Sequence, residues 1–144
     1  MVYVGYKKIL VPMDGSENSF RALDWAIYLA RQSGAIITGL YVIPSFIVTE
    51  GPKALGPYRK QMLEQGKNIM NDAKLRSAKK GIVFVEKIIY GDVVASDIVD
   101  FAAKTKPDLI VISSRGLSEI KELFLGSVTY GVVHKSKTPV FVVK

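Results

Sequence analysis

The chain has 144 residues, a formal net charge of +7 at pH 7, 49% hydrophobic residues and no cysteine. This length suits one domain that buries its own core, and the absence of cysteine excludes disulfides and thiolate-bound metals. The uncharged stretch over 34–49 is too short for a membrane span and is interrupted by Gly39 and Pro44. Because the N-terminus also lacks the apolar segment of a signal peptide, we expect one cytoplasmic domain over residues 1–144.

The first half of the chain alternates apolar runs with segments of helical periodicity. Residues 6–12 predict a strand, and Asp14-Gly15-Ser16 predicts a turn in which Ser16 caps the next helix. That helix is expected to end at Gly34, in the left-handed conformation that glycine adopts readily. A second strand follows over 36–43. The connection over 44–57 is apolar but broken by glycine and proline, so we interpret it as a lid or a contact surface.

The second half continues the same alternation. A helix is predicted over 58–80, a strand over 82–90, and then a third helix that Asp92 caps. After Pro107 comes a β-branched strand over 109–112. The chain closes with a fourth helix over 127–136 and an apolar strand over 140–143.

The alternation of strands and helices predicts the topology. Strands separated by helices run parallel and are joined by right-handed crossovers. We therefore expect an α/β fold, a three-layer α/β/α sandwich around a five-stranded parallel sheet of order 3-2-1-4-5. In that order the chain reverses direction between the first and fourth strands. A crevice opens there at the carboxyl ends of the strands, where the turn after residue 12 and the loop 113–116 meet.

The loop after the fourth strand has the residue types of a phosphate cradle. Ser113-Ser114-Arg115-Gly116 follows Ile112, and nine residues further on Gly126-Ser127 opens the next helix. Glycine lets backbone N–H groups approach an anion, and the unpaired amides of a helix N-terminus add further donors. The structural alternative is an ordinary loop with two glycines and a serine cap.

Asp14 follows the first strand directly and belongs to the same predicted crevice. Its carboxylate has the chemistry to accept hydrogen bonds from ribose hydroxyls or to help hold a metal near phosphates. The alternative is an aspartate that closes an Asx turn ahead of the helix. The crevice needs a polar group at this point, which favours the functional interpretation.

No catalytic residue is predicted. Ser113, Ser114 and Ser127 have no evident histidine base and no G-x-S-x-G elbow around them. His134 has no neighbours in the sequence with the spacing of a zinc site, and no metal ligand is assigned.

Two groups of helical residues are interpreted as structural. The large apolar side chains Phe20, Trp25 and Met62 are predicted to lie in the core. The basic residues of the helix over 58–80 are spread around it without interleaved aromatic residues. This distribution favours a solvated helix face over a nucleic-acid surface, so no nucleic-acid partner is expected.

Taken together, these segments resemble the universal stress protein family, and specifically its ATP-binding branch. Residues 7–16 are similar to the opening strand and acidic turn of the family, 40–43 to its second strand, and 138–143 to its closing strand. The nucleotide motif of the family, G-x2-G-x9-G-[ST], is matched in every spacing by residues 113–127. The one departure is Ser113, which stands at the first glycine position.

The resemblance implies a Rossmann-like sandwich of the adenine nucleotide alpha hydrolase-like type that binds ATP, or ADP or AMP, together with Mg²⁺. Phosphates would lie at Gly116, Gly126 and Ser127, with Asp14 at the ribose and Val42 on the adenine. Arg115 would add positive charge. The nucleotide-binding residues implied by the resemblance are Pro12, Met13, Asp14, Val42, Ile112, Ser113, Arg115, Gly116, Gly126, Ser127, Val128 and Thr129.

The resemblance further implies a homodimer in which the strands over Val140-Val143 of two subunits pair at the sheet edge. An apolar terminal strand with an exposed edge makes such pairing physically reasonable. The expected function is a nucleotide-dependent regulatory switch in the stress response, read by a protein partner. Two alternatives stay open: a slow ATPase or phosphotransferase at the same site, and a dimeric interaction protein that has lost nucleotide binding through Ser113.

Overall fold

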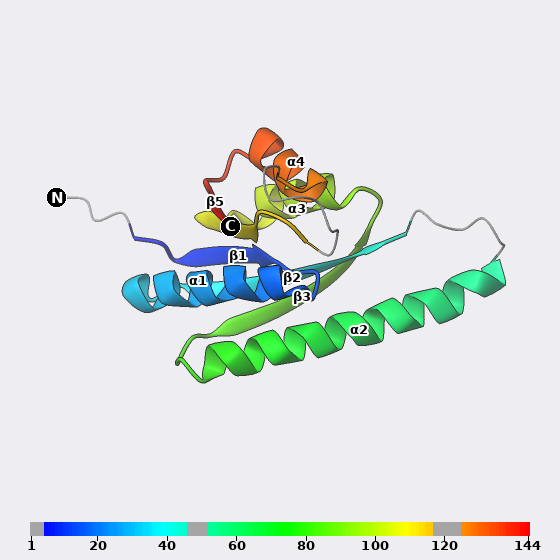
Figure 1. The fold of residues 1–144 in the computed structure, drawn as a ribbon, viewed down its shortest axis with the longest axis horizontal. Coiled ribbons are helices and arrows are strands. Elements are labelled where there is room, and N and C mark those ends of the chain that lie inside the picture. Colours follow the sequence, from blue (N-terminus) through cyan, green and yellow to red (C-terminus); the bar gives the residue numbers. More distant parts are fainter. Residues whose placement is uncertain (1–4, 46–51, 117–124) are drawn as a thin grey trace.

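The computed structural model describes residues 5–45, 52–116 and 125–144. Its five strands form one parallel sheet in the order β3-β2-β1-β4-β5 (Figure 1). This order confirms the predicted topology. The strands are β1 (Lys8–Pro12), β2 (Ile36–Pro44), β3 (Phe84–Gly91), β4 (Leu109–Ser113) and β5 (Val140–Val143).

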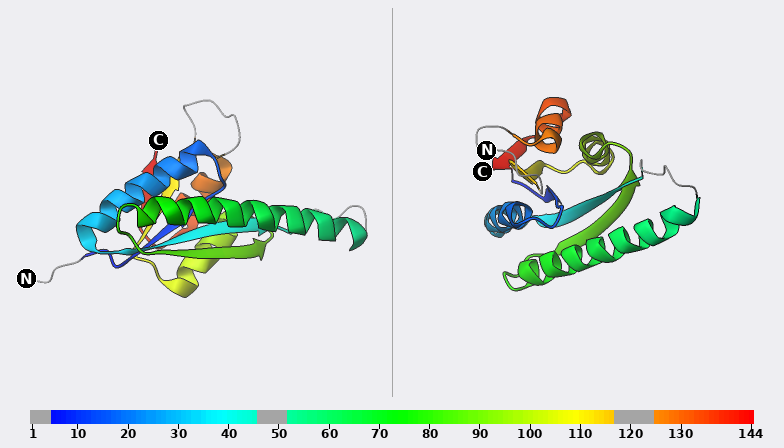
Figure 2. Two further views of the ribbon diagram at one scale, coloured as in Figure 1. Left: turned by 90° about the horizontal axis from the view of Figure 1, so that it is seen from below. Right: turned by 45° about the vertical axis from the view of Figure 1, so that its right-hand side comes forward.

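Helices cover both faces of the sheet, so the predicted three layers are confirmed. The helices α1 (Glu17–Ser33) and α2 (Pro52–Ala78) pack on one face. The helices α3 (Val94–Thr105) and α4 (Ser127–Lys135) pack on the other (Figure 2). A parallel sheet buried on both sides accounts for the nearly continuous apolar runs of its central strands.

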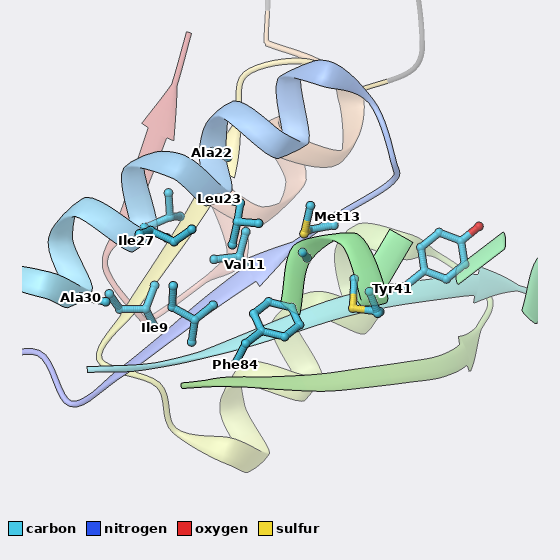
Figure 3. Packing of buried hydrophobic residues seen from close by; sticks show 14 of the residues in the cluster. Ile9, Val11, Met13, Ala22, Leu23, Ile27, Ala30, Tyr41 and Phe84 are labelled. Carbon is cyan, nitrogen blue, oxygen red and sulfur yellow. The ribbon is translucent and has the colours of Figure 1, made fainter. Parts of the chain in front are cut away.

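Successive side chains of β1 show how the two cores are built. Ile9 and Val11 belong to the core beneath α1 and α2, together with Leu23 and Phe84 (Figure 3). Leu10, between them in sequence, belongs to the other core beneath α3 and α4. This assignment follows from the period of two in a strand, which sends alternate side chains to opposite faces.

The first helix begins and ends where its residues predict. Ser16 is its N-cap and accepts a hydrogen bond from the Ser19 N–H at 3.1 Å. Gly34 is its C-cap with φ of 73°, the left-handed region, and its N–H donates to the carbonyl of Ala30. Because only residues 13–16 separate β1 from α1, the cap at Ser16 helps to fix where this turn lies at the edge of the sheet.

The predicted start of the second helix was wrong. Helix α2 begins at Pro52, and Pro57 lies inside it. Proline is tolerated in the first turn because the N–H groups there have no intrahelical acceptor; Pro57 lies further along, at an exposed position where water can reach the freed carbonyl. Residues 46–51 of the predicted lid lie outside the described residues.

The predicted cap of the third helix was also wrong. Val93 is the N-cap of α3, without a side-chain hydrogen bond to the helix. Asp92 lies one residue too early, and its Oδ1 accepts from the hydroxyl of Ser45 at 3.0 Å. Its carboxylate therefore ties the end of β3 to the end of β2, a contact between segments far apart in sequence.

Trp25 does not lie in the core. Its side chain is 46% exposed, and it contacts the rings of Tyr28 and Phe141 at centroid distances of 5.9 Å each. Phe20 and Met62, in contrast, are partly buried against the core beneath α1 and α2. The prediction failed for Trp25 because it occupies the side of α1 that faces the edge strand β5.

A carboxylate before β4 connects that strand to the entry of β1. The N–H groups of Lys7 and Lys8 donate to Asp108 Oδ2 at 2.8 and 3.0 Å. These two hydrogen bonds hold the pKa of Asp108 below its ordinary value. In the unfolded chain both bonds are lost, so the carboxylate contributes stability that is present above its unfolded pKa, near 3.9, and disappears as the pH falls through the folded pKa.

We expect Asp108→Ala to lower the free energy of unfolding by about 1 kcal/mol at pH 7, the usual range for hydrogen bonds to an exposed carboxylate. The difference from the wild-type protein should shrink as the pH falls below about 4, where the wild-type carboxylate becomes protonated. Urea unfolding at pH 7 and below pH 4 measures both values. A gap that stays constant with pH would contradict this account of Asp108.

Candidate functional site

A cavity of about 280 Å³ opens at the carboxyl ends of the strands, at the point where the chain reverses between β1 and β4. All of the predicted binding residues except Arg115 line it: Pro12, Met13, Asp14, Val42, Ile112, Ser113, Gly116, Gly126, Ser127, Val128 and Thr129. Arg115 lies next to Gly116 but is not part of the lining. The lining residues that sequence analysis missed are Ser19, Leu40, Tyr41, Pro44, Met62, Val94 and Ile98.

The apolar part of the cavity lies between β2 and α3. Leu40 and Val42 reach it from the strand, and Val94 and Ile98 from successive turns of the helix. The sequence marks Val94 and Ile98 only as an apolar stripe at helical spacing, so nothing separates them from ordinary core residues. An apolar slot of this kind suits a flat, weakly polar group such as a nucleobase.

Asp14 and Gly116 bring the two predicted segments into contact. Asp14 Oδ1 accepts from the N–H of Ser16 at 2.9 Å, which closes an Asx turn. The carboxylate also packs against Gly116, where an added Cβ would lie 2.2 Å from Asp14 Oδ2. Because residue 116 is glycine, there is room for the Asp14 carboxylate just beyond the carboxyl end of β1.

The N-terminus of α4 presents backbone donors to the cavity. The first intrahelical bond joins the N–H of Tyr130 to the carbonyl of Gly126. The N–H groups of Ser127, Val128 and Thr129 therefore have no acceptor within the helix. The helix dipole adds a partial positive charge at this end, so the three amides form a site suited to an anion.

Neither the backbone conformation at position 126 nor the described neighbouring atoms require glycine there. Its φ of −60° and ψ of 158° are open to any residue, and its own N–H donates to the carbonyl of Ser114 at 2.8 Å. An added Cβ would meet Ser114 O at 3.5 Å, an ordinary van der Waals distance. The absence of a side chain here leaves space in the cavity above the amides of α4.

Ser113 is accommodated without strain at the first glycine position of the motif. It is the last residue of β4, and its φ does not lie in the left-handed region. Its carbonyl accepts a hydrogen bond of 2.6 Å from the hydroxyl of Thr129. This bond joins β4 to α4 and commits the Thr129 hydroxyl to the protein, which leaves the Thr129 N–H to face a ligand.

In the part of the chain that the structure describes, no group of three or more His, Cys, Asp or Glu side chains could hold a metal ion. Asp14 is the carboxylate among the residues that line the cavity. Across the same described ranges, no helix is both long and apolar enough to cross a membrane.

A parallel sheet wound in both directions, with a cavity at its reversal point and a helix N-terminus facing it, defines a Rossmann-like α/β protein. The comparison with family models is more specific. The model of the universal stress protein family matches residues 5–144, and the chain belongs to that family.

Known relatives agree along nearly the whole chain. Universal stress protein MJ0577 of Methanocaldococcus jannaschii is 31% identical over 98% of this chain and 96% of its own. The solved structure of MJ0577 matches with a TM-score of 0.88 at 32% identity, covering 98% of this chain and 97% of that one. The shared fold therefore includes every element around the cavity.

Two further solved structures are nucleotide complexes. A universal stress protein in complex with cAMP matches with a TM-score of 0.73 at 30% identity, covering 97% of this chain and 98% of that one. A universal stress protein from Archaeoglobus fulgidus in complex with dAMP matches with a TM-score of 0.71 at 25% identity, covering 98% and 100%. Proteins similar to this chain thus bind adenine nucleotides.

Proposed function

We propose that this chain binds an adenine nucleotide, ATP or its ADP or AMP forms, and acts in the cytoplasm as a nucleotide-dependent regulatory switch in the stress response. The observation that supports it most directly is the N-terminus of α4. Its first three N–H groups have no acceptor within the helix, and they belong to residues that line the cavity beside Gly126. The nucleotide complexes of similar proteins support the same ligand class. A protein partner that reads the bound nucleotide would complete the switch.

The lining of the cavity suggests how the nucleotide would lie. The slot formed by Val42, Val94 and Ile98 is suited to the adenine base. The phosphates would accept hydrogen bonds from the amides at the start of α4, with the hydroxyl of Ser127 as a further donor. Asp14, at the mouth of β1, would face the sugar. Serine at position 113 leaves this arrangement intact, because its backbone is extended and its carbonyl bonds to Thr129.

Mg²⁺ would enter this site together with the nucleotide. The described residues offer no protein cage for it, and Mg²⁺ commonly binds through one or two carboxylates, waters and substrate phosphates. Because the proposal assigns Asp14 to the sugar, phosphate oxygens and waters would be the ligands of the ion. When bound, the ion would neutralise part of the phosphate charge.

The nucleotide content of freshly purified protein tests the proposal. Denaturation should release an adenine nucleotide that mass spectrometry identifies, and protein stripped of it should rebind ATP, ADP or AMP in calorimetry. Protein that carries no nucleotide and gives no heat with any of the three would overturn the proposal. That result would instead favour an interaction protein that has lost nucleotide binding.

We also propose that the chain forms a homodimer through β5. This strand is at the edge of the sheet and pairs with β4 on its other side. Phe141 is 36% exposed on it and lies against the exposed ring of Trp25. An unprotected apolar edge invites pairing with another strand, and a two-fold axis through β5 would cover both edges and both aromatic pairs.

Phe141→Glu is expected to convert the dimer to a monomer, because it places two like charges next to the two-fold axis. The matched control is Val85→Glu on β3, the opposite edge strand, where Val85 is 38% exposed. Light scattering after size exclusion gives the mass of each variant. A Phe141→Glu protein that keeps the mass of the wild-type dimer, or a wild-type protein that is monomeric, would contradict pairing through β5.

A further inference from the structure

Tyr41 lines the cavity from the side of the sheet that α1 and α2 cover, and the proposed nucleotide site gives its hydroxyl no role. Its side chain is only 5% exposed and lines the cavity. The ring packs against Gly66 of α2, where an added Cβ would lie 2.4 Å from the ring carbon Cδ1. Glycine weakens a helix interior, so its presence at 66 is explained by the space that the ring needs. The ring is therefore held in one place.

The hydroxyl of Tyr41 has no hydrogen-bond partner among the described residues. A buried phenol normally finds one. Among those residues, one buried side-chain polar atom, Asp97 Oδ2, has neither a hydrogen-bond partner nor contact with solvent. The Tyr41 oxygen also lacks a partner but is not such an atom, so it borders open space. Figure 3 shows this oxygen pointing away from the packed side chains of the core. The open space described next to this side chain is the cavity that Tyr41 lines.

The surroundings of Tyr41 keep the hydroxyl protonated. Its pKa is raised above the ordinary value mainly by burial, and further by Tyr58 and by Asp14. At neutral pH the phenol is therefore a hydrogen-bond donor. Asp14, near enough to act on this pKa, lines the same cavity and offers carboxylate oxygens as acceptors. A donor and an acceptor facing one space are complementary to the two hydroxyls of a ribose.

We propose that Tyr41 is a specificity-determining residue that donates a hydrogen bond to a ribose hydroxyl of the bound nucleotide, beside Asp14, which accepts one. The inference rests on the proposed nucleotide site and adds a preference for ribose over deoxyribose. It places the base against Leu40 and Val42, the neighbours of Tyr41 whose side chains face the opposite side of the sheet. The similar protein from Archaeoglobus fulgidus binds dAMP, so this preference would distinguish the chain within its family.

Tyr41→Phe tests the inference because it removes one oxygen and keeps the ring against Gly66. We expect the wild-type protein to bind ATP more tightly than 2′-deoxy-ATP or 3′-deoxy-ATP in calorimetry. The variant should bind ATP about three- to tenfold more weakly, as expected for one lost hydrogen bond. The ratio of its affinity for ATP to its affinity for at least one of the two deoxynucleotides should fall by the same factor. The control is Tyr90→Phe, which removes an exposed hydroxyl outside the cavity.

The outcomes separate this inference from the proposed function. If the wild-type protein binds none of the three nucleotides, the proposed site itself is wrong. If it binds them and Tyr41→Phe leaves every affinity unchanged, Tyr41 has no part in recognition. An equal loss of affinity for all three would place the hydroxyl on a phosphate or the base, and would overturn the ribose assignment. Unchanged melting temperatures of both variants would show that the fold is intact.

Discussion

Gly126→Ala is expected to weaken ATP binding at least tenfold while it changes the free energy of unfolding by less than about 1 kcal/mol. The backbone of Gly126 is in a conformation open to alanine, and the new Cβ would meet described protein atoms only at 3.5 Å or more. The methyl group would instead occupy the space above the amides of α4, where the proposed function puts the phosphates of the nucleotide. A tenfold loss corresponds to about 1.4 kcal/mol, which is comparable to one hydrogen bond to a charged oxygen. Titration calorimetry and urea unfolding measure the two quantities.

Gly34→Ala is the matched control with the opposite expectation. Gly34 ends α1 with φ of 73°, so alanine there should cost about 1 kcal/mol of stability. It does not line the cavity, and ATP affinity should stay as in the wild-type protein. A Gly126→Ala protein with unchanged ATP affinity would show that phosphates do not approach this helix start.

Gly39→Ala is expected to destabilise the fold by about 1–3 kcal/mol, the usual range for an overpacked core. In β2 the ring of Phe84 lies over Gly39, and an added Cβ would be 2.2 Å from Phe84 Cζ and 3.2 Å from the sulfur of Met70. Phe84 and Met70 are buried, so the ring has little room to move away. Urea unfolding of the variant measures the loss.

A second substitution tests whether the clash with Phe84 causes that loss. Phe84→Leu shortens the side chain at the point of contact, and alone it should destabilise the protein by about 1–2 kcal/mol. In the double variant the two losses should not add, because leucine leaves room for the new methyl group. Additive losses would show that Gly39 is needed for another reason, such as the backbone of β2.

Much of the fold could be predicted because its signals are local. Alternation of apolar runs and helical spacing determined the number and order of the elements, and the parallel sheet followed from crossover geometry. Ser16 and Gly34 predicted the ends of α1 correctly, because a cap depends on the residues of one turn.

Two of the errors, the cap of α3 and the position of Trp25, arose where a contact across the fold outweighed a local preference. Asp92 has the side chain of a helix cap, yet it bonds to Ser45 at the end of a neighbouring strand. Trp25 has the size and hydrophobicity of a core residue, yet it lies against Phe141 at the sheet edge. Local sequence contains no information about which strand ends a residue will meet.

The same division holds for the site. Residue patterns alone predicted that the turn at Asp14 and the segment 113–116 meet, since a strand order with one reversal brings them to the same edge. They did not identify the lining residues of α2 and α3. The contacts of each group in the site became visible in the folded protein alone. Contacts between distant residues place the Asp14 carboxylate against Gly116 and pair the Thr129 hydroxyl with the Ser113 carbonyl. Among the described residues they leave the Tyr41 hydroxyl without a partner, in a side chain that lines the cavity. Such contacts depend on how close two side chains lie in the folded protein, and this distance cannot be read from the number of residues between them.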